Sequence, residues 1–182
     1  MRSLALFVCA LFIFALSASP SRAQAPAPFH SETTDLVIQL PAGWEGAQSV
    51  SETTLPARAT YRFEATAPGL AGAVVIVERV IGLNPLAQER FRRGQVAFGY
   101  HGLRPTALLA GEEMVFGSGA GLAVSGGDRI GRVYFVQRGR VFWAVHLAAP
   151  EATLAQTPGL LDTLARGVRL SDREIRPEMV SR

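Results

Sequence analysis

The residues best suited to acid–base chemistry or metal binding are three histidines, His30, His101 and His146. Histidine serves both purposes because its pKa lies near neutral pH and its neutral ring nitrogens ligate metal ions. His146 lies within VFWAVHLAA (141–149), where both alternating faces of a strand would be apolar. We therefore expect His146 to be a buried, neutral structural residue, with a ligand or catalytic role as the alternative.

The other candidate motifs give little support for catalysis. His101 follows an expected helix, and a helix C-terminus favours an imidazole, so we expect it to cap that helix or to be solvated. HxH, HxxxH and HExxH spacings do not occur, and a zinc site needs at least three ligands, so we expect no metal and no cofactor. GSGAG (117–121) has the spacing of neither a dinucleotide-binding loop nor a nucleophile elbow. We predict that the protein is not an enzyme.

All 18 basic side chains are arginines. The absence of lysine excludes a P-loop and Schiff-base catalysis. Arginine suits the recognition of carboxylates and phosphates and is common at interfaces, although a solvated surface is the alternative. The candidate binding residues are Arg90, Arg92, Arg93, Arg138 and Arg140, with Trp44 as either an anchor at the rim or a core residue. Nucleic acid is not an expected partner, because no stacking motif accompanies the arginines.

The N-terminus has the pattern of a secretory signal peptide. Arg2 precedes an apolar run over 4–18, and small residues precede Ala23 and Ala25. We expect a Sec-type signal peptide over 1–23, cleaved near Ala23 or Ala25, and a periplasmic or secreted protein with no integral membrane span after cleavage. An uncleaved anchor is the alternative. The single cysteine, Cys9, lies in this signal, so the mature chain has no disulfide.

The rest of the chain is predicted to be a flexible leader (24–34), a single domain (35–170) and a polar C-terminal tail (171–182). Strands are expected over 35–40, 59–66, 73–81, 106–119 with a break at Gly111, and 121–148 with a tight turn at Arg138-Gly139. Helices are expected over 84–100 and 157–168, and irregular chain is expected over 45–57. Strands that come in blocks rather than alternating with helices favour an α+β fold: an antiparallel sheet with two main helices packed on it.

Four features, in order, resemble the PsbP/Mog1/DcrB-like α/β/α sandwich group. They are LPAGW (40–44), a helix after a β-branched strand, RGRVFWAVHLAAPE (138–151) and a terminal amphipathic helix, together covering about 35–170. Members of this group are mostly non-catalytic binding or assembly modules, so the resemblance implies interaction rather than chemistry. The group shares no catalytic motif, and the resemblance therefore carries over no functional residue. The chain also lacks the lipobox cysteine of those members that are lipoproteins.

These observations predict a non-enzymatic, exported interaction or assembly module that binds a protein partner of the cell envelope. The alternative is a small-ligand carrier, or a weakly marked hydrolase, with a pocket between sheet and helix. In that case His146 or His101 would line the pocket.

Overall fold

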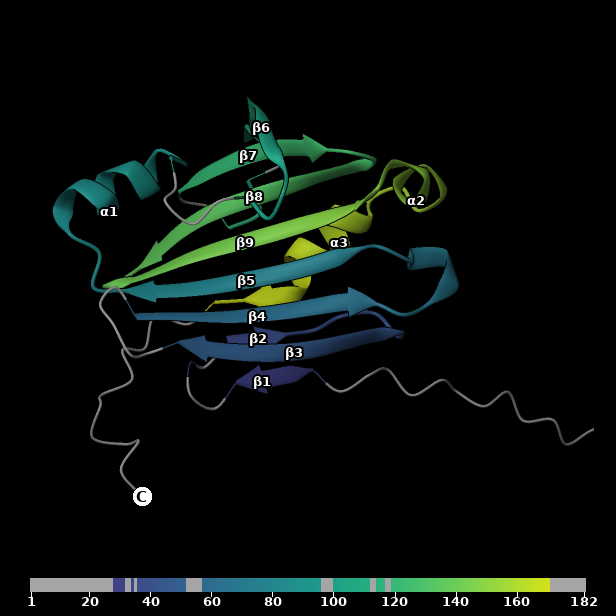
Figure 1. The fold of residues 1–182 in the computed structure, drawn as a ribbon, viewed down its shortest axis with the longest axis horizontal. Coiled ribbons are helices and arrows are strands. Elements are labelled where there is room, and N and C mark those ends of the chain that lie inside the picture. The colour runs from purple at the N-terminus through teal and green to yellow at the C-terminus, as the bar shows by residue number, and fades with distance from the viewer. Residues whose placement is uncertain are drawn as a thin grey trace, which may run out of the picture.

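The computed structural model describes residues 28–170, except 32–33, 35, 52–56, 96–99, 112–113 and 117–118. Its main element is a seven-stranded antiparallel sheet with the order β3-β4-β5-β9-β8-β7-β6 (Figure 1). The strands are β3 (Trp44–Ser51), β4 (Ala57–Ala65), β5 (Val74–Ile81), β6 (Arg104–Leu108), β7 (Ala120–Gly126), β8 (Arg129–Arg138) and β9 (Val141–Pro150). The expected α+β class is confirmed.

Within the described residues, the remaining elements are a small sheet and four short helices. The small sheet has the order β1-β2-β10, with β1 (Phe29–Ser31), β2 (Leu36–Ile38) and β10 (Val168–Arg169). The helices are η1 (Pro68–Leu70), α1 (Pro85–Arg92), α2 (Glu151–Gln156) and α3 (Leu160–Gly167). Among the described residues, no helix has the length and apolar character needed to cross a membrane.

Strand β9 lies at the centre of the large sheet and is buried on both faces. Trp143, Val145 and Leu147 point to the face that packs against α3 and the small sheet. Phe142 and Ala144 point to the opposite face, where α1 packs. A strand with two apolar faces is typical of a sheet covered on both sides, and the structure confirms this expectation for 141–149.

Helix α1 is shorter than the sequence pattern predicts. Asn84 caps it, because its side-chain Oδ1 accepts a hydrogen bond of 2.9 Å from the Ala87 backbone N–H. The helix ends at Arg92, and Gly94 follows with φ +71°, a conformation that glycine adopts readily and that stops a helix. The predicted helix over 84–100 is therefore too long at its C-terminal end, and 96–99 lie outside the described residues.

Two other predicted segments begin or end differently. The last helix starts at Leu160 rather than 157, because Gly159 takes the N-cap position with φ +79°. A separate helix, α2, precedes it. In the other segment, strand β6 ends at Leu108, so the predicted strand over 106–119 is too long. The expected amphipathic terminal helix is confirmed, since Leu161, Leu164 and Ala165 of α3 are buried, as is Val168 in the following β10.

Segments expected to be irregular supply further strands. The prediction of irregular chain over 45–57 is wrong, because Trp44–Ser51 pairs in register with β4 despite its polar composition. Backbone hydrogen bonds, which do not depend on side-chain type, form this edge strand.

The leader predicted over 24–34 is also partly wrong, because its second half belongs to the folded domain. Phe29 packs edge-to-face on Phe63, with the ring centroids 5.1 Å apart. The hydroxyls of Ser31 and Thr34 lie 3.0 Å and 2.7 Å from the Tyr61 hydroxyl. The predicted signal peptide and the polar tail lie outside the described residues.

Candidate functional site

A glutamate in the middle of an apolar strand marks the candidate site. Glu78 lies on β5 between Ile76 and Val80, which pack with residues on the α1 face of the sheet. Its side chain is fully buried, with 0% exposure. The register of β5 with β9 pairs Ile76 with His146 and Glu78 with Ala144, so Glu78 and His146 are diagonal neighbours on one face.

His146 contacts this glutamate directly. Its Nε2 lies 3.1 Å from Glu78 Oε2, and only 4% of the residue is exposed. Its Nδ1 is buried without a hydrogen-bond partner among the described residues. Burial, reinforced by the nearby His101 and Arg58, lowers the pKa of His146 to about 3. His146 is thus buried and neutral at pH 7, while a purely structural role for it stays a prediction.

His101 joins the same cluster, although the sequence predicts a helix cap or a solvated residue. Helix α1 ends nine positions earlier, at Arg92, so His101 does not cap α1. Its Nε2 lies 3.5 Å from Glu78 Oε1, and its ring meets that of His146 edge-to-face with the centroids 4.7 Å apart. Its side chain is 29% exposed. Burial, followed by the charges of Arg58 and Arg62, lowers the pKa of His101.

Arg58 compensates the charge of the buried carboxylate. It comes from β4, and its guanidinium forms an ion pair with Glu78 Oε1. A buried carboxylate without such a partner would be strongly destabilising. Burial lowers the pKa of Arg58.

Glu78, His101 and His146 are hereafter called the histidine–glutamate cluster. One candidate ligand atom from each lies within 4.8 Å of the others, so these residues could hold a metal ion. Glu78 and Arg58 were not among the residues predicted from the sequence. Glu78 could have been noticed because it is a carboxylate that directly follows the apolar run VVIV in a β-branched strand.

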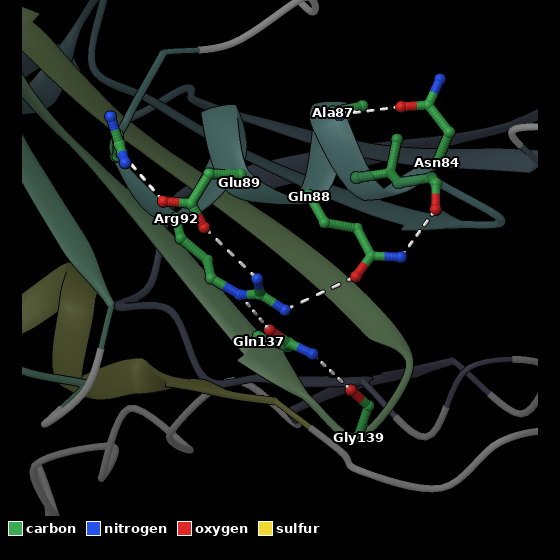
Figure 2. Close-up of polar contacts among 9 residues, drawn as sticks. Asn84, Ala87, Gln88, Glu89, Arg92, Gln137 and Gly139 are labelled. Carbon is green, nitrogen blue, oxygen red and sulfur yellow. Dashed lines mark hydrogen bonds and ion pairs between the residues drawn. The ribbon is translucent and has the colours of Figure 1, made fainter.

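The structure brings the predicted binding arginines together at one end of the sheet. Arg92 Nε on α1 donates a hydrogen bond of 2.9 Å to Gln137 Oε1 at the end of β8 (Figure 2). Gln137 Nε2 in turn donates to the Gly139 carbonyl in the β8–β9 turn, at 2.8 Å. Glu89 forms ion pairs with Arg92 at 3.5 Å and with Arg93 at 2.8 Å. Helix α1 and the β8–β9 hairpin are therefore joined by polar contacts.

This end of the molecule is hereafter called the arginine end and comprises Arg90, Arg92, Arg93, Arg138 and Arg140. Four of these residues are exposed, and Arg138 is half-buried. A cavity of about 410 Å³ opens between α1 and β8. Its lining residues are Phe91, Arg92, Gly119, Phe135, Gln137 and Gly139. Neither His101 nor His146 lines this cavity. The expectation that one of these histidines lines a pocket between sheet and helix is therefore not met at this cavity.

Trp44 lies away from the arginine end. It begins β3 and pairs with Ala65, whereas the β8–β9 turn is at the opposite end of the sheet. Trp44 is half-buried and lines a separate cavity of about 270 Å³ with Phe29 and Phe63. The structure thus does not place Trp44 with the arginines.

Comparison of the sequence with protein-family models finds no match, and comparison with curated proteins finds none either.

Proposed function

We propose that this chain is an exported, non-enzymatic interaction module that binds a protein partner of the cell envelope through the arginine end. The observation that carries the proposal is the hydrogen bond between Arg92 and Gln137, which fixes the arginines of α1 beside those of the β8–β9 hairpin. The fold proposed for this role is a PsbP/Mog1/DcrB-like sandwich, in keeping with its sheet covered on both faces.

The chemistry of the surface favours an acidic partner segment. Five arginines gather there, and Glu89 on the same helix forms ion pairs with Arg92 and Arg93. Arginine forms forked hydrogen bonds with carboxylates, and a surface of one charge sign raises the association rate with an opposite one. The cavity beside Phe91 offers a place for an apolar anchor of the same segment.

The test combines cross-linking in the cell envelope with charge reversal. The tagged, exported protein is cross-linked in intact cells, and captured proteins are identified by mass spectrometry. The double variant Arg92→Glu/Arg93→Glu should lose the specific partner, and raising the salt concentration should weaken the interaction with the purified partner. Arg169→Glu is the matched control, since Arg169 is an exposed arginine of the small sheet.

Two results would contradict the proposal. One is a partner retained equally by the wild type and the double variant. The other is a partner lost equally in the double variant and in Arg169→Glu, because that result would show a general charge effect.

A second candidate function is the binding of a small ligand. The convergence of His101 and His146 on a buried carboxylate favours it. A thermal-shift screen of metabolites and metal ions tests it, because a ligand that binds only the folded state raises the unfolding temperature.

A further inference from the structure

We propose that Glu78, His101 and His146 form a binding site for one divalent transition-metal ion of the Zn²⁺ type. The inference is independent of the arginine end and makes the second candidate function specific. Two imidazoles and one carboxylate are a ligand set that Zn²⁺ and related ions accept, and three protein ligands leave one coordination position open.

The distances within the cluster fit a single ion. Ligand atoms about 2.0–2.2 Å from a tetrahedral ion lie about 3.3 Å from one another. Glu78 Oε2 is 3.1 Å from His146 Nε2, and Glu78 Oε1 is 3.5 Å from His101 Nε2. Each ring nitrogen thus lies within reach of one oxygen of the same carboxylate, and one candidate ligand atom from each residue lies within 4.8 Å of the others.

The position of His146 is set by its strand and by its contact with Glu78. His146 is fixed in the sheet with its Nδ1 unpartnered among the described residues, which leaves Glu78 as the described group that orients it.

His101 shows an additional feature. Among the described residues it is the one non-glycine residue with positive φ, at +51°. This conformation is uncommon for a residue with a side chain, and such residues are frequent at functional sites. It occurs in a turn that directs the ring toward Glu78, while 29% of the side chain stays exposed. An ion can therefore approach from the His101 side.

Arg58 is the cation that balances Glu78 before an ion arrives. Its guanidinium and a divalent ion would repel each other if both stayed at the carboxylate. The Arg58 side chain is 34% exposed, and Arg58 lies near the N-terminal end of β4, so the side chain can turn toward solvent when an ion binds. Arg58 therefore weakens metal binding while it keeps the buried carboxylate compensated.

The experiment is calorimetric titration of the purified, exported protein with ZnCl₂ at pH 7.5, after treatment with a chelator. Saturation at one ion per chain is expected. Titration with Co²⁺ should give the intense visible absorption of a four-coordinate site with nitrogen and oxygen ligands. His101→Asn should weaken Zn²⁺ binding by at least about tenfold, because it removes a direct ligand.

Controls separate this site from other effects. His30→Asn removes the remaining histidine, which lies on β1, and should leave affinity unchanged. Arg58→Met should strengthen binding by about tenfold, because it removes the competing cation. Arg169→Met, which removes an exposed arginine of the small sheet, should change affinity by less than about threefold.

Because Glu78 and His146 are buried, substitutions there can unfold the protein. The decisive variant is therefore His101→Asn, because His101 is partly exposed, with folding checked by circular dichroism. The proposal is overturned if the wild type shows no saturable binding at one ion per chain. It is also overturned if folded His101→Asn binds as the wild type does, or if His30→Asn loses binding equally.

Discussion

Phe91→Ala tests how helix α1 is held on the sheet. Phe91 is the one buried residue of this eight-residue helix, at 2% exposure. Its ring packs edge-to-face on Phe135 and Phe142, with centroid distances of 5.2 Å and 5.3 Å. So short a helix is marginal by itself in water, so its stability depends on its contacts with the sheet, of which Phe91 is the fully buried one.

The expected loss in the free energy of unfolding follows from the apolar area that Phe91 buries. Removing the ring takes away about 150 Å² of buried apolar surface, worth about 4 kcal/mol at about 25 cal/mol per Å². That value lies within the range of about 3–5 kcal/mol found for Phe→Ala in cores. We therefore expect the free energy of unfolding to fall by about 4 kcal/mol.

The assay is urea denaturation followed by fluorescence, together with amide hydrogen exchange of α1 and β9. Leu86→Ala is the matched control, because Leu86 lies on the same helix and is 62% exposed. It should change stability by less than about 0.5 kcal/mol. In Phe91→Ala the amides of α1 should exchange faster than those of β9, as the helix loses its anchor first.

The reasoning would be refuted if Phe91→Ala lost less than about 1.5 kcal/mol, or no more than Leu86→Ala does. Unchanged protection of the α1 amides relative to those of β9 would refute it as well.

Three further predictions concern charge, capping and backbone packing. The folded-state pKa of His146, about 3, lies below its unfolded value near 6.5, so the unfolded state binds a proton more readily than the folded state. The free energy of unfolding is therefore highest above pH 6.5 and falls as the pH falls toward 3. In metal-free protein, urea denaturation should therefore show a loss of about 2 kcal/mol between pH 7 and pH 5, and His146→Asn should lack that part of the slope. Asn84→Ala should cost about 1 kcal/mol, measured in the same way, because it removes the hydrogen bond to the Ala87 N–H; no loss would show that the cap is dispensable. Gly131→Ala should cost about 1–3 kcal/mol, because the added Cβ would collide with the Leu147 carbonyl oxygen, and a wild-type denaturation midpoint would contradict this.

Periodicity in the sequence predicted those elements whose side chains alternate between core and solvent. The strand over 59–66 and the stripe of α3 were found because burial imposes a period of two or of about 3.6 residues. Strand β3 was missed because it is a polar edge strand, held by its ladder to β4. The end of α1 was missed because the backbone conformation of Gly94 stops the helix before its apolar pattern ends.

In the candidate site, too, the sequence predicted some features and only the structure showed the others. The sequence by itself indicated that His146 lies in a strand with two apolar faces, and local patterning is enough for that inference. It could not show that Glu78 and His146, 68 positions apart, are diagonal neighbours on adjacent strands. Nor could it show that the turn at His101 brings a second ring to the same carboxylate.

The sequence determined the α+β composition, the core segments and the arginine-rich chemistry, because these depend on residue types and on spacing over a few positions. The tertiary structure decided which distant residues meet: the arginines of α1 with those of the β8–β9 hairpin, and two histidines with one buried glutamate. Strand order and register determine which distant residues come into contact. Both arise from the packing of the whole chain rather than from any local stretch of it.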